Sequence, residues 1–153
     1  MVKQFTFTVP GPVVPQARPR AAMVAGHIAM HDTRECQSYK MDVASCASRA
    51  MAEAGLKAPV EPDDQGFTVT IYINKAYLKR LSKKKIEQAK MGMLLPLAKP
   101  DLDNAAKGIL DALKSVFWKD DSAVTSLYVT KRYAPMDSVA VDIIWKEKPD
   151  VRK

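Results

Sequence analysis

Four stretches of this 153-residue chain alternate apolar residues with other residues, and this period of two limits the fold more than any other feature. The stretches cover residues 4–9, 67–73, 127–129 and 139–145. Because successive side chains of a β-strand point to opposite faces, each stretch predicts a strand with one buried face. Between the first two stretches the pattern changes: apolar and small residues from Glu35 to Ala54 recur at helical spacing, and Gly55 follows as a C-terminal cap.

The connections predict smaller elements. Four of the ten prolines fall between residues 10 and 19, which predicts a loop or edge segment, because proline has no N–H for a sheet ladder. The stretch AMVAGHIAM predicts a short hairpin around Gly26, and Ser82 predicts the cap of a short helix that stops at Gly92. Together the patterns predict one α+β domain over residues 1–153, with a mixed sheet of about four strands, one long helix and one or two shorter helices.

The composition limits which kind of binding partner and which cellular compartment we expect for this chain. A formal net charge of +7 favours a polyanionic partner such as nucleic acid. No run of eighteen apolar residues occurs, which predicts no membrane span, and the N-terminal MVKQFTFTVPGP lacks a secretory pattern, so we expect a cytoplasmic protein. Cys36 and Cys46 match neither a zinc pattern nor a disulfide framework.

This basic chain nevertheless concentrates five of its seventeen acids between residues 101 and 121. They are Asp101, Asp103, Asp111, Asp120 and Asp121. Pro100 disfavours helical backbone at Lys99, so we expect a helix to begin just after it. Asp101 and Asp103 then lie at the helix N-terminus, where the helix dipole favours negative charge, and Lys107 lies one turn beyond Asp103 on the same face.

The same helix has a predicted packing face. The stripe that docks it onto the sheet consists of Ala106, Leu110, Leu113 and Phe117. Gly108 inside the helix costs about 1 kcal/mol relative to alanine. That cost predicts either close packing or a close backbone approach at this position.

Two interpretations of the acids stay open at this point. Asp101 or Asp103 is an N-cap, Asp103 and Lys107 form a surface ion pair, and Asp120–Asp121 is a turn; or the acids hold a divalent cation. Mg²⁺ takes one or two carboxylates and leaves the rest of its shell to water and phosphate. Such a cation relieves the repulsion between crowded carboxylates, and a nearby lysine supplies positive charge where a phosphodiester gains negative charge.

Several motifs resemble one family of nucleases. The stretches SKKKIEQAKMG, KPDLDNAAKGILDAL and FWKDDSAV, together with the N-terminal VPGPVVPQARPR, resemble the RusA family of Holliday junction resolvases. The similarity covers most of the chain in order and is sharpest from Ser82 to Val124. It implies a RusA-like fold and a homodimeric endodeoxyribonuclease that nicks four-way DNA junctions symmetrically with Mg²⁺, for which Mn²⁺ substitutes. Members commonly come from bacteriophages and prophages.

The resemblance also implies roles for particular residues. By matching positions, the metal-binding carboxylates are Asp101, Asp103 and Asp121, and the catalytic lysine is Lys107. Asp120 is the weaker candidate of the adjacent pair, and Asp111 matches a recurrent helix position for which we favour a structural role. Some members carry one more residue before the Asp–Asp pair, so the third ligand depends on the motif and not on a fixed spacing.

Basic residues of two segments are predicted to hold DNA phosphates with little reading of bases. They are Arg18, Arg20, Lys75, Lys79, Arg80, Lys83, Lys84, Lys85, Lys90 and Lys99. A solvated charged face is the alternative for the lysine-rich segment. Two other functions remain open for the whole chain: a non-catalytic protein that binds branched DNA, and a metal-dependent nuclease for other branched or flap DNA.

Overall fold

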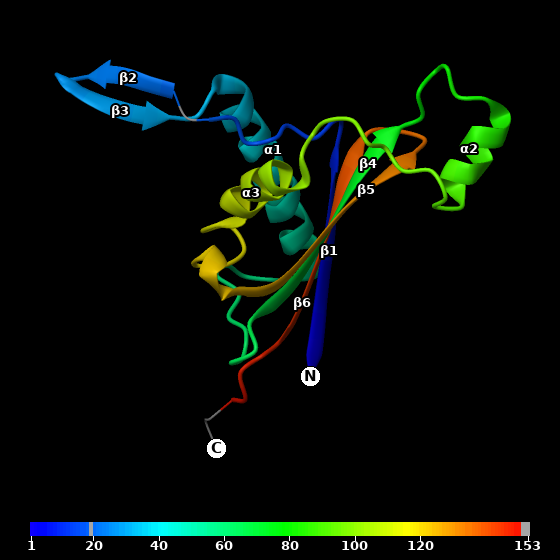
Figure 1. Ribbon diagram of the computed structural model, residues 1–153. Helices are drawn as coiled ribbons and strands as arrows, with labels where there is room; N and C mark the ends of the chain where they lie inside the picture. The colour runs from blue at the N-terminus through cyan, green and yellow to red at the C-terminus, as the bar shows by residue number, and fades with distance from the viewer. Residues whose placement is uncertain (19, 151–153) are drawn as a thin grey trace.

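A four-stranded mixed sheet forms the centre of the computed structural model, which describes residues 1–18 and 20–150 (Figure 1). The strands, in their order across the sheet, are β1 (Val2–Pro10), β6 (Ser138–Lys146), β4 (Phe67–Ala76) and β5 (Val124–Ala134). β4 and β5 run parallel, and the other neighbouring strands run antiparallel. The predicted α+β arrangement and its mixed sheet are confirmed, although the last two strands begin one or three residues before the alternating stretches that predicted them.

Two helices cover one face of this sheet (Figure 1). α1 (Arg34–Ala54) buries Val43 and Ala47, which recur at helical spacing, against the inward-facing residues of β1. α3 (Leu102–Leu113) lies beside α1 and buries Ile109 and Leu113 in the same core. Gly55, with φ 70°, ends α1 in the left-handed conformation, as the sequence predicts.

The predicted stripe of α3 is wrong at one residue, because the helix ends before Phe117. Lys114 is extended and Ser115 has φ 68°, so the chain turns there, and the Phe117 amide donates to the Leu113 carbonyl at 2.9 Å. Phe117 is nevertheless fully buried, and its ring lies 5.2 Å from that of Phe5 between centroids. Phe117 therefore reaches the core from the turn after α3 and not from the helix itself.

Two small elements extend away from the sheet and its helices (Figure 1). One is a hairpin of β2 (Arg20–Val24) and β3 (His27–His31), which confirms the predicted turn around Gly26. The other is α2 (Lys83–Lys90), whose N-cap Ser82 accepts a hydrogen bond from the Lys85 amide. Within the described residues, no helix combines the length and the apolar character needed to cross a membrane.

Candidate functional site

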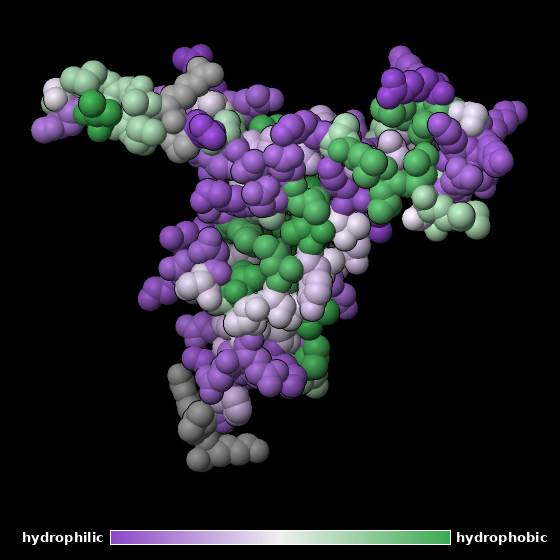
Figure 2. All heavy atoms as spheres, viewed as in Figure 1, coloured by the Kyte–Doolittle hydropathy of each residue, from purple (hydrophilic) through white to green (hydrophobic). Residues whose placement is uncertain are grey.

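A shallow hollow of about 330 Å³ lies between α3 and β5 and collects most of the predicted catalytic residues. Asp103, Lys107 and Asp111 follow one another at one-turn intervals along α3, and Asp121 reaches the hollow from the 3₁₀ turn Asp121–Ala123 before β5. The apolar part of the lining consists of Leu102, Ala106, Leu110, Leu127 and Val129. Figure 2 shows hydrophobic residues at the centre of this face with hydrophilic residues around them.

The acids at this hollow act on each other. The hydrogen bond between the side chains of Asp121 and Asp120 raises the pKa of Asp121 above its ordinary value. Burial and the charges of Asp120 and Asp111 act in the same direction. Asp120 also caps the 3₁₀ turn, because its carboxylate accepts a hydrogen bond from the Ser122 amide at 3.3 Å. Asp120 therefore has the turn role that one interpretation gave it. The neighbouring negative charges act on Asp121, whose pKa is raised.

Asp101 does not line this hollow. It occupies the N-cap position of α3 without a side-chain cap bond, and its carboxylate pairs with the Lys99 ammonium at 3.1 Å. Asp101 lines a second cavity, of about 950 Å³, between residues 13–17, the start of α1 and the start of α3. Among the described residues, no three acidic, histidine or cysteine side chains converge as a ready metal site. The three-carboxylate set thus stays a prediction.

The residues at the hollow fit a hard cation in their chemistry. Asp103 and Asp121 line the same space, and Mg²⁺ needs no more than one or two carboxylates when water and phosphate complete its shell. After the hydrogen bond to Asp120 and burial, the charges of Asp120 and Asp111 add to the raised pKa of Asp121, and a bound cation would relieve this repulsion. The Lys107 ammonium forms no hydrogen bond or ion pair with any described residue, so the surface pair with Asp103 that one interpretation offered is absent.

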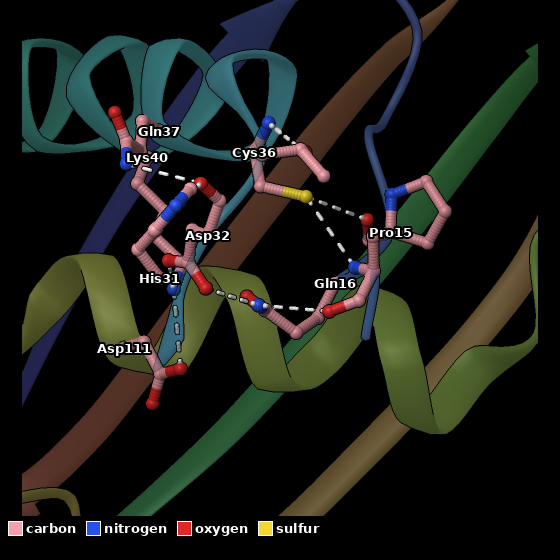
Figure 3. A network of polar contacts seen from close by, with 10 residues as sticks. Pro15, Gln16, His31, Asp32, Cys36, Gln37, Lys40 and Asp111 are labelled. Atoms are coloured by element: carbon pink, nitrogen blue, oxygen red, sulfur yellow. Dashed lines mark hydrogen bonds and ion pairs between the residues drawn. The ribbon is translucent and has the colours of Figure 1, made fainter. Parts of the chain in front are cut away.

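A polar network that contains Asp111 includes two residues that the sequence did not single out, Asp32 and Lys40 (Figure 3). The Lys40 ammonium lies 2.7 Å from the Asp32 carboxylate and 3.4 Å from that of Asp111. The Gln16 side-chain amide donates to Asp32 at 2.7 Å. The ion pair between Lys40 and Asp111 joins α1 to α3 and supports the structural role that we favoured for Asp111. No local pattern relates Lys40 to a partner 71 positions away.

Replacing Lys40 by Met is expected to lower the free energy of unfolding by about 1–3 kcal/mol near neutral pH, because two carboxylates lose their charged partner. The hydrogen bond from Lys40 holds the pKa of Asp32 below its ordinary value of 3.8. A lowered pKa means that this stabilisation exists above pH 3.8 and disappears as the pH falls through the folded-state value. The difference between wild type and variant should therefore shrink in strong acid.

Urea unfolding of both proteins across pH 2–7 measures this difference. Lys90→Met is the matched control, since Lys90 forms an exposed pair with Glu87 at 3.3 Å, and such pairs contribute about 0.5 kcal/mol or less. Equal losses in the two variants would contradict the role of Lys40.

The predicted phosphate-binding residues are not equivalent. Figure 2 shows hydrophilic residues gathered over the region of α2. The exposed ones there are Lys79, Arg80, Lys83, Lys84, Lys85 and Lys90. Lys75 is half-buried and donates to the Lys99 carbonyl at 3.1 Å, while Lys131, which the sequence did not single out, donates to the Ala98 carbonyl at 2.8 Å. These two lysines therefore bind the backbone of the segment that leads into α3.

Two more predicted phosphate contacts lie near the start of the hairpin. Arg18 is exposed and has no hydrogen bond or ion pair within the part of the chain that the structure describes. The Arg20 backbone pairs with His31, but its side chain, like Pro19 before it, lies outside the described residues. Lys99 is exposed, and its ammonium lies 3.1 Å from the Asp101 carboxylate.

An α+β domain with acids and an unpaired lysine at one hollow, together with a lysine-rich projection around α2 (residues 79–90), has features typical of proteins that act on nucleic acid. The comparison with known families makes this specific. The family model described as endodeoxyribonuclease RusA matches residues 10–144, and the chain belongs to this family. Membership implies endodeoxyribonuclease activity and confirms the resemblance noted in the sequence.

One relative extends this similarity to nearly the whole chain. The uncharacterized protein YqaN of Bacillus subtilis (strain 168) is 39% identical to it over 137 residues. The match covers 90% of this chain and 93% of the relative. The similarity therefore includes both the hollow and the lysine-rich projection.

Proposed function

We propose that this protein is a Holliday junction resolvase, which nicks two strands of a four-way DNA junction symmetrically in recombination and repair. Mg²⁺ is the proposed cofactor, and Mn²⁺ substitutes for it. The observation that carries the proposal is the shared hollow of Asp103, Lys107 and Asp121 in a chain of the RusA endodeoxyribonuclease family. A cytoplasmic location and a phage or prophage origin belong to the same proposal.

Each residue at the hollow has a proposed role. Asp103 and Asp121 would hold the metal, with Asp101 as the third ligand predicted by the motif. A metal bound there would polarise a phosphodiester and lower the pKa of water. Lys107, whose ammonium has no partner among the described residues, would place positive charge beside the phosphate or orient the attacking water.

The basic residues support binding to the DNA backbone. The exposed lysines of α2 and its flanks, with Arg18, would neutralise phosphates, so affinity should fall steeply as salt rises. A four-way junction presents two equivalent strands, and a homodimer with two-fold symmetry offers one site to each. Because phosphate contacts carry little base information, junction choice would depend mainly on shape.

Cleavage of a labelled four-way junction by the purified protein tests the proposal. With Mg²⁺ we expect paired nicks at symmetric positions, and with EDTA in its place we expect binding without nicks. Retention of the junction without nicks in Mg²⁺ would support the non-catalytic binding protein instead. Faster cutting of a flap than of the junction would support a nuclease for other branched DNA.

A further inference from the structure

The β2–β3 hairpin has one wholly apolar face that no other part of the described chain covers. Across the two strands Ala21 pairs with Met30, and Met23 pairs with Ile28, so all four side chains share a face. Met23, Ile28 and Met30 are 70%, 73% and 63% exposed. Figure 2 shows the hairpin as a mainly hydrophobic projection separated from the core. Such a face is unusual on a strand pair that contributes nothing to the core.

We propose that this face contacts unstacked bases at the centre of branched DNA, an inference that rests on the proposed function. Methionine and isoleucine are among the apolar side chains that proteins insert between base steps. Methionine also adapts its shape to irregular surfaces, because its side chain is unbranched and polarisable. Bases at a branch point are less constrained by stacking than bases in a duplex, so they present apolar faces at lower cost.

The charges around the hairpin favour DNA as the occupant. The segment from Ala17 to His31 contains no acidic residue, and Arg18 at its start is exposed. The opposite face of the hairpin carries His27 and His31, both exposed. An apolar face on a projection without negative charge suits a partner that combines phosphates with stacked aromatic rings, and β-ribbons are known readers of nucleic acid.

The base of the hairpin is attached to the helix that carries the candidate site. Before the hairpin, the backbone N–H of Gln16 donates to the backbone carbonyl of Asn104 in α3 at 3.0 Å. After it, Asp32 is joined through Lys40 to Asp111, also on α3 (Figure 3). A hairpin that engaged the branch point would therefore be held in a defined relation to Asp103 and Lys107. This arrangement links recognition of the branch to the site of cutting.

The connecting turn makes the hairpin a defined projection. Ala25 and Gly26 both have positive φ, 49° and 82°, as in a two-residue turn whose twist matches the strands. The five residue pairs of β2 and β3 continue from this turn to the base. Polar substitutions on the apolar face should leave this backbone pairing unchanged.

The test compares the wild type with the triple variant Met23→Ser/Ile28→Ser/Met30→Ser. The probe is a four-way junction with 2-aminopurine at the branch point, titrated in EDTA so that binding is measured without cutting. We expect wild-type binding to brighten the unstacked 2-aminopurine. The triple variant should lose this change and bind the junction about ten-fold more weakly, the scale of one base contact. Both proteins should bind a linear duplex equally.

Met41→Ser/Met136→Ser is the matched control, because these methionines are 70% and 74% exposed outside the hairpin, and it should behave as wild type. Unchanged fluorescence with bound wild type, or equal brightening by the triple variant, would overturn the inference. A change in the triple variant's oligomeric mass would also overturn it, by showing that a second copy covers the face. If the wild type brightens the probe but never cuts in Mg²⁺, the proposed function fails and the hairpin inference stands.

Discussion

Asp103→Asn is expected to slow Mg²⁺-dependent cleavage of a four-way junction by a factor on the order of 100 or more, while junction binding in EDTA stays unchanged. The amide keeps the size of the carboxylate but removes the charge that would hold the cation. Asp103 is exposed on the first turn of α3, so the substitution takes nothing from the core. Single-turnover cleavage of a labelled junction, beside a gel-shift titration, separates chemistry from affinity.

Asp42→Asn is the matched control, since Asp42 is exposed on α1 outside the hollow. Asp121→Asn should lose cleavage in the same way as Asp103→Asn, because both residues line one space. Asp101→Asn decides the third ligand: the proposal expects lost cleavage with retained binding, and a wild-type rate would remove Asp101 from the metal set. A wild-type rate for Asp103→Asn would show that the hollow is not the catalytic site.

Gly66→Ala is expected to lower the free energy of unfolding by about 2–5 kcal/mol, which combines the left-handed backbone cost with overpacking. Gly66 has φ 73°, and an added Cβ would lie 2.5 Å from the Ala123 carbonyl oxygen and 2.7 Å from Cγ2 of Thr125. This glycine lets the start of β4 approach the turn that carries Asp121. At about 2–4 °C per kcal/mol for a domain of this size, thermal unfolding should shift by roughly 10 °C.

Gly108→Ala provides the matched comparison, because here a Cβ would meet Val14 O at 3.8 Å and Gln16 N at 3.9 Å, which are ordinary contacts. The segment before the hairpin does pass close to α3 at Gly108, yet it leaves room for a methyl group. Alanine should therefore recover up to about 1 kcal/mol of helix propensity. If Gly66→Ala and Gly108→Ala unfold at the same temperature, the argument from close approach at Gly66 is wrong.

Local patterns predicted the main elements of the fold. Alternation predicted all four strands of the sheet, and helical spacing closed by Gly55 predicted α1. Pro100 and the acids after it predicted where α3 begins. Its end was not predictable, because the apolar residues continue to Phe117 at helical spacing while the backbone turns at Ser115 to deliver that ring to the core. Tertiary packing of Phe117 therefore accompanies a turn at Ser115, where the helical spacing of the apolar residues had predicted a continued helix.

The sequence by itself determined the elements, the concentration of acids with Lys107 among them, and the family motif, because each depends on neighbours within a few turns of the chain. Only the tertiary structure decided that Asp121 shares a hollow with Asp103 and that Asp101 faces another cavity. It alone joined Lys40 to Asp111 and left the apolar face of the hairpin open. The physical reason is that the packing of α1, α3 and β5 brings these distant segments together, and no local pattern encodes a contact across such separations.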